Sequence, residues 1–81
     1  MKHPGAKFEA GDMVQIADRL ALDQFLQSWK FHHPLQPEQL EYARKVAKVA
    51  QALMYHGGDI MYVLEGVPGI WHQRLVEAHS N

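Results

Sequence analysis

Two glycine-containing turns in the segment 55–71 restrict the fold of this chain more than any other part of its sequence. The first is the run His56-Gly57-Gly58-Asp59, and the second is Gly66-Val67-Pro68-Gly69. Adjacent glycines adopt the positive φ angles that short hairpin loops need, so the first run predicts a hairpin connection. Between the turns, residues 60–65 alternate in the manner of a strand. One face of that strand carries Ile60, Tyr62 and Leu64, and the other carries Met61, Val63 and Glu65.

The segment before the hairpin allows two interpretations. It contains strong helix formers, and a helical stripe would be made by Leu40, Ala43, Ala47, Ala50 and Met54. A spacing of two or four residues, which favours a strand, relates Val49, Leu53 and Tyr55. A hairpin needs two strands, and this segment is the upstream neighbour of the turn. We therefore predict a strand from about Lys45 to Tyr55.

The first half of the chain predicts one short strand followed by two helices. Gly11-Asp12 supplies a turn before a strand at 13–16. A helix over about 19–29, which Asp18 can cap, has an apolar face made by Leu22, Phe25, Leu26 and Trp29. Pro34 stops this region, and Pro37 suits the first turn of a short helix over 37–42.

The two ends of the chain carry weaker signals. Residues 1–10 form a polar lead that we expect to be loose at its start. Residues 70–76 predict a last strand, or a strand that runs into a helical turn, and 77–81 predict a tail. We expect one domain over 1–81, because 81 residues are too few for two.

Composition excludes several classes of function. The formal net charge is −1, which argues against a nucleic-acid partner, because phosphate neutralisation needs a concentration of Lys and Arg. There is no cysteine, so neither a disulfide framework nor a thiolate metal site can form. No apolar run approaches the length of a membrane span, and no signal-peptide hydrophobic region is present. We therefore expect a cytoplasmic protein with no membrane partner.

Three motifs resemble those of a known group. They are Trp29-Lys30-Phe31-His32-His33-Pro34-Leu35, then Tyr55-His56-Gly57-Gly58-Asp59 with Tyr62, then the run from Leu64 to His72. Together they resemble a group of short bacterial proteins carried on mobile integron gene cassettes. With the strand 11–16, the pattern is similar to small SH3-like barrels. The resemblance implies a mainly β fold with a helical insertion (α+β), in which two helices occupy about residues 17–42 between the first and second strands. It implies no activity.

Looser similarities exist to the plasmid-type dihydrofolate reductase and to the nitrile hydratase β subunit, which use such barrels. The reductase resembles this chain in its opening Gly-Asp-x-Val strand and in its length. It builds its active pore from a Val-Gln-Ile-Tyr stretch. The comparable place here is Ile70-Trp71-His72-Gln73, which does not match. We do not carry the reductase activity over.

Histidine is the residue type most suggestive of chemistry, with six copies. His56 and Asp59 flank the first turn, and a carboxylate beside an imidazole is the minimal acid–base unit. No serine lies near them in sequence, and no His spacing matches a known metal motif, so we predict no catalytic residue, no metal and no cofactor. We expect a ligand cleft lined by His32, His33, Tyr55, His56, Asp59, Trp71 and His72. The alternative is that these histidines only bond loop backbone and pack against aromatic rings.

Met61 and Val63 raise the question of self-association. If Tyr62 faces the interior, these two apolar side chains point outward. We expect the helices to cover part of the barrel and a homodimer to cover the rest, with Met61 and Val63 at the interface. The sequence thus predicts a homodimeric binding or assembly module, not an enzyme, with a small-molecule or peptide ligand. The alternative is a small enzyme or metal-binding protein that uses His56 and Asp59.

Overall fold

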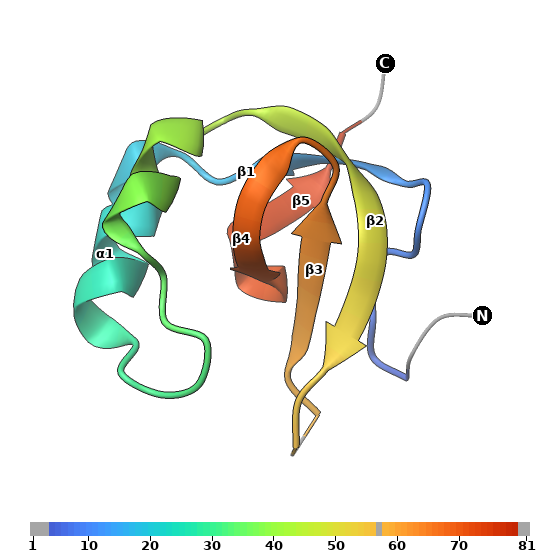
Figure 1. Ribbon diagram of the computed structural model, residues 1–81, viewed down its shortest axis with the longest axis horizontal. Helices are drawn as coiled ribbons and strands as arrows, with labels where there is room; N and C mark the ends of the chain where they lie inside the picture. Colours follow the sequence, from blue (N-terminus) through green and yellow to red (C-terminus); the bar gives the residue numbers. More distant parts are fainter. Residues whose placement is uncertain (1–3, 57, 80–81) are drawn as a thin grey trace.

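The strands of this protein form one antiparallel sheet with two helices to one side (Figure 1). The computed structural model describes residues 4–56 and 58–79 of the 81-residue chain. Over these residues the sheet has five strands in the order β4-β3-β2-β1-β5. The elements are β1 (Met13–Ile16), α1 (Arg19–Ser28), the 3₁₀ helix η1 (Pro37–Tyr42), β2 (Val46–Met54), β3 (Ile60–Leu64), β4 (Val67–His72), the 3₁₀ turn η2 (Gln73–Leu75) and β5 (Val76–Ala78).

The connection between β1 and β2 contains both α1 and η1, as the sequence predicts. The Asp18 carboxylate caps α1 by accepting a hydrogen bond of 2.9 Å from the Ala21 amide. Leu22 and Phe25 are buried, so the predicted apolar face of α1 packs on the core. None of the helices in the described ranges is long and apolar enough to cross a membrane.

The 3₁₀ helix η1 is joined to the sheet through one amide side chain. Gln39 is buried, and its Nε2 donates to the Ile70 carbonyl oxygen of β4 at 3.2 Å. Gly69 lies beside it with φ +94°, and a Cβ added there would lie 2.6 Å from Gln39 Nε2. The close approach and the left-handed backbone both require glycine at this position.

The disputed segment before the hairpin is a strand, which confirms the prediction. β2 pairs with β3, with Leu53 opposite Met61 and Met54 opposite Ile60. The hairpin is closed by a hydrogen bond of 2.8 Å from the Tyr55 amide to the Asp59 carbonyl oxygen. Gly57 lies outside the described residues.

The end of the chain agrees with the prediction only in part. The sequence predicts a turn over 66–69, but β4 already begins at Val67, because the turn before it needs only Gly66, which has φ +74°. β4 runs into the 3₁₀ turn η2, which confirms the predicted strand that runs into a helical turn. The chain then forms β5 at Val76–Ala78, mostly within the segment for which the sequence predicts a tail. β5 pairs with β1, with Val76 opposite Ile16 and Ala78 opposite Val14. The last strand thus lies beside the first.

The core is built on one face of the β2–β3–β4 sheet. Tyr62 and Trp71 are directly opposite each other on β3 and β4, and both are fully buried. The Phe8 ring meets Tyr62 edge-on at 5.6 Å, so the end of the predicted polar lead belongs to the core. The Tyr62 hydroxyl accepts hydrogen bonds of 3.2 Å from the Lys7 and Phe8 amides and donates to the Gln73 side chain. Burial raises the pKa of Tyr62, which keeps this donor protonated.

Met61 does not occupy the exposed position that the sequence predicts. It lies opposite Leu53 and His72, on the face away from Tyr62, so its predicted direction is right. Yet only 2% of Met61 is exposed, and Val63 is half-buried. The outer face of β3 is therefore covered within the chain, and Met61 is not available as a dimer contact.

The Tyr62 hydroxyl gives a direct test of how the N-terminal segment is held. Tyr62→Phe removes the acceptor for the Phe8 amide and the donor for Gln73, so we expect a loss of about 1–3 kcal/mol in the free energy of unfolding. Urea denaturation measures this change. Tyr42→Phe is the matched control, because the Tyr42 hydroxyl makes no hydrogen bond within residues 4–56 and 58–79. It should change stability by less than about 0.5 kcal/mol. Equal losses in both variants would contradict this role of Tyr62.

Candidate functional site

The loop after α1 meets the end of the β2–β3 hairpin, and this contact brings together most of the predicted cleft residues. The imidazole of His32 stacks on the Tyr55 ring with centroids 3.7 Å apart and planes 8° apart. The His33 ring approaches the same Tyr55 ring edge-on, with centroids 5.8 Å apart. The ring of His56, the next residue after Tyr55, also meets it edge-on, with centroids 5.3 Å apart. Rings from two distant segments therefore share one surface.

His32 also contacts the carboxylate of the hairpin. Its Nε2 lies 3.0 Å from Asp59 Oδ2, with 14% of the His32 side chain and 49% of the Asp59 side chain exposed. The oxygen does not lie along the ring N–H direction, so His32 Nε2 makes no hydrogen bond. The two side chains therefore form an ion pair only when His32 is protonated. The sequence suggested His56 as the partner of Asp59, and that pairing is wrong.

The fixed point beneath this surface is His72. Only 5% of His72 is exposed, and its Nε2 lies 2.9 Å from the carbonyl oxygen of His33. A carbonyl oxygen can only accept, so Nε2 carries the proton of the neutral ring. Three rings surround it at centroid distances of 4.9 Å for Phe25, 5.0 Å for Trp29 and 5.6 Å for His32. Burial lowers the pKa of His72, and the nearby rings of His32 and His33 act in the same direction, whereas the hydrogen bond to the His33 carbonyl oxygen and the Asp59 carboxylate oppose them.

The backbone around His33 is unusual. His33 has φ +48°, a left-handed value that is costly for a residue with a side chain. Because its carbonyl oxygen accepts a hydrogen bond from His72 Nε2, this strained residue is held by a buried partner. Trp29 holds the same loop from the other side, since its Nε1 donates to the His32 carbonyl oxygen at 2.8 Å. The loop is therefore tied to the sheet at two points.

Trp71 does not line the cleft, contrary to the prediction. It is fully buried, and its Nε1 donates to the Pro68 carbonyl oxygen at 3.2 Å. The pairing with Tyr62 directs the indole to the core face, whereas His72, one residue later, takes the opposite face. A shift of one residue in this register would exchange the two side chains.

One exposed aromatic residue of the loop, Phe31, completes the surface and rests on Trp29. Trp29 is half-buried, and the Phe31 ring meets it edge-on at 5.1 Å while 68% of Phe31 is exposed. We call the histidine–aromatic surface the set of Phe31, His32, His33, Tyr55 and His56. A hollow of about 300 Å³ beside it is lined by Met54, Tyr55, His56 and Gly58. The described residues contain no group of three His, Asp or Glu side chains that could hold a metal ion.

Sequence reasoning missed one charged neighbour of this region. The guanidinium carbon of Arg74 lies 5.3 Å from the Phe25 ring centroid and 5.1 Å from that of Trp29. The sequence could have suggested this neighbour, because Arg74 follows His72 by only two residues, near the end of the same predicted strand. Only the packing of α1 against η2 shows which rings it covers.

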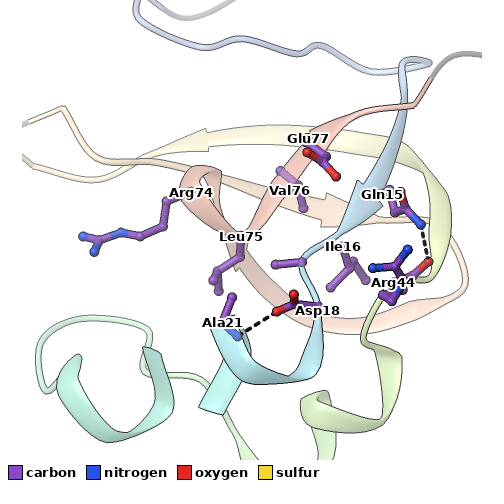
Figure 2. Close-up of a pocket in the computed structure, with 10 residues that line it drawn as sticks. Gln15, Ile16, Asp18, Ala21, Arg44, Arg74, Leu75, Val76 and Glu77 are labelled. Carbon is purple, nitrogen blue, oxygen red and sulfur yellow. Dashed lines mark hydrogen bonds between the residues drawn. The ribbon is translucent and has the colours of Figure 1, made fainter. Parts of the chain in front are cut away.

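A separate hollow of about 240 Å³ lies away from the histidines, between the start of α1 and the β1–β5 pair (Figure 2). Its charges balance, with Arg44 and Arg74 against Asp18 and Glu77. Arg44 has φ +66°, and its carbonyl oxygen accepts from the Gln15 side chain at 2.9 Å. Asp18 is engaged in capping α1. Because its charges balance and its Gln15 and Asp18 side chains serve the fold, this hollow is a weaker candidate than the histidine–aromatic surface.

The buried His72 makes the stability of this region depend on pH. Its folded-state pKa is lowered, so protons bind more readily to the unfolded chain, and folding loses stability as pH falls through the ordinary histidine pKa of about 6.5. We expect the free energy of unfolding of the natural chain to fall between pH 7.5 and pH 5, with at most about 1.4 kcal/mol per pH unit from this group.

The comparison variant for this experiment is His72→Gln, which keeps an N–H donor but cannot titrate. Its stability should change less between the same pH values. His56→Gln is the control, because His56 is exposed, and it should leave the pH dependence of the natural chain in place. If His72→Gln retained the full pH dependence, the buried neutral ring would not be its source.

Comparison with known proteins adds no further assignment to this geometry. No protein-family model and no curated protein matches this chain. The functional interpretation therefore rests on the side chains described above.

Proposed function

We propose that this protein is a small, non-catalytic binding module that holds an extended peptide on its histidine–aromatic surface. The observation that carries the proposal is the stacked pair of His32 and Tyr55, in which the His32 ring packs against the buried His72. Exposed, rigidly held rings are the usual anchors of peptide recognition, because they offer large contact areas at a small cost in side-chain entropy. The fold that we propose is an SH3-like barrel with a helical insertion. The pairing of β5 with β1 after a 3₁₀ turn supports it.

The chemistry of the surface fits a peptide with apolar or proline-rich character. Phe31 and Tyr55 are exposed aromatic residues, with 68% of Phe31 and 37% of Tyr55 accessible to solvent. The imidazoles of His33 and His56 are exposed and can donate or accept hydrogen bonds to peptide backbone. Aromatic-lined grooves of small barrels recognise preformed extended peptides in this way, because little chain entropy is lost on binding.

The alternative of an acid–base or metal activity has one supporting contact, that of His32 with Asp59. A general base is normally oriented by a hydrogen bond to its carboxylate partner, and His32 Nε2 has none. The described residues also lack a three-ligand group. A binding role uses the same residues without these requirements, so it is the better proposal.

Self-association remains part of the proposal, on a different surface from the one that the sequence indicated. Met61 is buried, whereas 51% of Met54 is exposed at the end of β2. Met54 borders the hollow that Tyr55 and His56 line. A homodimer formed across Met54 would cover this apolar side chain next to the peptide surface.

Light scattering coupled to size-exclusion chromatography tests the dimer. We expect about twice the chain mass of 9.3 kDa at micromolar concentration, and a shift to the monomer mass in Met54→Lys. The exposed Leu20→Lys on α1 serves as the control and should leave the dimer intact, since 66% of Leu20 is exposed elsewhere on the chain. A monomer at every concentration would overturn the dimer.

Peptide binding is tested by titrating ¹⁵N-labelled protein with a set of proline-rich dodecapeptides. We expect saturable shift changes confined to residues 29–33 and 54–59. Phe31→Ala and Tyr55→Ala should each weaken binding by about five- to fiftyfold, as expected for anchor residues. Leu20→Ala removes a comparably exposed apolar side chain outside the surface and should have no effect. The proposal fails if no peptide gives saturable changes or if Leu20→Ala weakens binding equally.

A further inference from the structure

We propose a second binding site, for a small organic carboxylate, in the hollow between α1 and η2 where Arg74 lies over two aromatic rings. This site is separate from the histidine–aromatic surface. Three observations carry the inference: the position of the guanidinium, its unused donors, and the composition of the hollow.

The guanidinium of Arg74 lies over two aromatic rings. Phe25 and Trp29 stack with centroids 5.3 Å apart and planes 14° apart, and the Arg74 guanidinium carbon lies 5.3 Å and 5.1 Å from the two centroids. Cation–π attraction to both rings favours this position of the side chain, although Arg74 is exposed to solvent. The stem starts from η2, where the neighbouring Leu75 is buried. The rings therefore lower the entropy that Arg74 would lose on binding a ligand.

The donors of this guanidinium are unused. Within the described residues Arg74 forms no ion pair and donates no hydrogen bond. The one acidic side chain on α1, Asp23, contacts Arg19 at 3.5 Å. A guanidinium carries five N–H donors in a planar fork that matches a carboxylate with two parallel hydrogen bonds. The position of this guanidinium over the two rings and its unused donors together favour an oxyanion as the ligand.

The residues that line the hollow beside Arg74 indicate which kind of oxyanion would bind there. It has a volume of about 270 Å³ and is lined by Ala21, Gln24, Phe25, Ser28, Arg74 and Leu75. Of these, only Arg74 carries a charge, so a monoanion is neutralised while a phosphate dianion is not. Ala21, Phe25 and Leu75 offer an apolar wall for the body of an organic acid. The Gln24 side-chain amide makes no hydrogen bond to any residue that the structure describes. The Ser28 hydroxyl donates to the Gln24 backbone carbonyl oxygen at 2.7 Å, which leaves the hydroxyl oxygen able to accept.

The neighbouring hollow at the start of α1 does not compete for the guanidinium. It shares Ala21, Arg74 and Leu75 with the proposed site. Figure 2 shows the Arg74 side chain directed away from Gln15, Arg44 and Glu77, which lie at the other end of that hollow. The carboxylate of Glu77 is therefore not placed to occupy the fork.

Sodium benzoate is the probe for this site. In titrations of ¹⁵N-labelled protein at constant ionic strength, we expect saturable shifts of the Arg74 side-chain Nε–Hε signal and of the amides of residues 24–28. The dissociation constant should lie in the millimolar range for a ligand of this size. Benzamide, which has the same ring without the charge, should give no saturable shift. Equal responses to benzoate and benzamide, or shifts that never saturate, would overturn the site.

Two substitutions locate the binding. Arg74→Gln should weaken benzoate binding by about tenfold or more, and Arg74→Lys, which keeps a cation over the rings, should retain a weaker part of it. Arg19→Gln removes an exposed arginine from the same helix and should leave the affinity unchanged. Thermal melting of each variant confirms that the fold is retained. Unchanged benzoate affinity in Arg74→Gln, or an equal loss in Arg19→Gln, would overturn the assignment to Arg74.

Discussion

The hydrogen bond from buried His72 to the carbonyl oxygen of His33 is the interaction on which the candidate surface depends. It joins β4 to the loop after α1, two segments 39 residues apart in the chain. The surrounding rings of Phe25, Trp29 and His32 exclude water, so the bond is stronger than it would be at the surface and also costly to break. Burial disfavours the charged form of the ring, because a buried imidazolium would lose its hydration. His72 therefore links the sheet to the loop that carries the two more exposed histidines, His32 and His33.

Much of the fold is readable from local sequence, and the exceptions have physical causes. The predicted helices and the strands at 13–16, 45–55 and 60–65 agree with the structure to within one or two residues. The β2 segment was the most uncertain, because its alanines and lysines favour helix, and only the need of the hairpin for a partner decided it. β5 was missed because three residues carry too weak a periodic signal. Its existence depends on β1, which lies some sixty residues earlier in the chain.

The sequence predicts which residues gather at the candidate site better than it predicts which of them contact each other. His32, His33, Tyr55, His56 and Asp59 do gather at the hairpin, because the loop and the turn reach the same end of the sheet. The sequence could not show that Asp59 meets His32, since that contact depends on where the loop crosses β3 and β4. It also could not assign Trp71 and His72 to opposite faces, because the register against β3 decides this. The alternative in which a histidine bonds loop backbone is realised by His72.

The amide of Gln39 on the carbonyl oxygen of Ile70 has a consequence for how crowded solutions of this protein behave. β4 is an outermost strand, and such a strand offers unpaired backbone groups to which another molecule could add a strand of its own. Here Pro68 contributes no N–H, Gly69 admits the Gln39 side chain, and that side chain occupies a backbone acceptor. The β4 edge of the sheet therefore offers fewer free backbone groups to an added strand, close to the aromatic rings that the protein exposes.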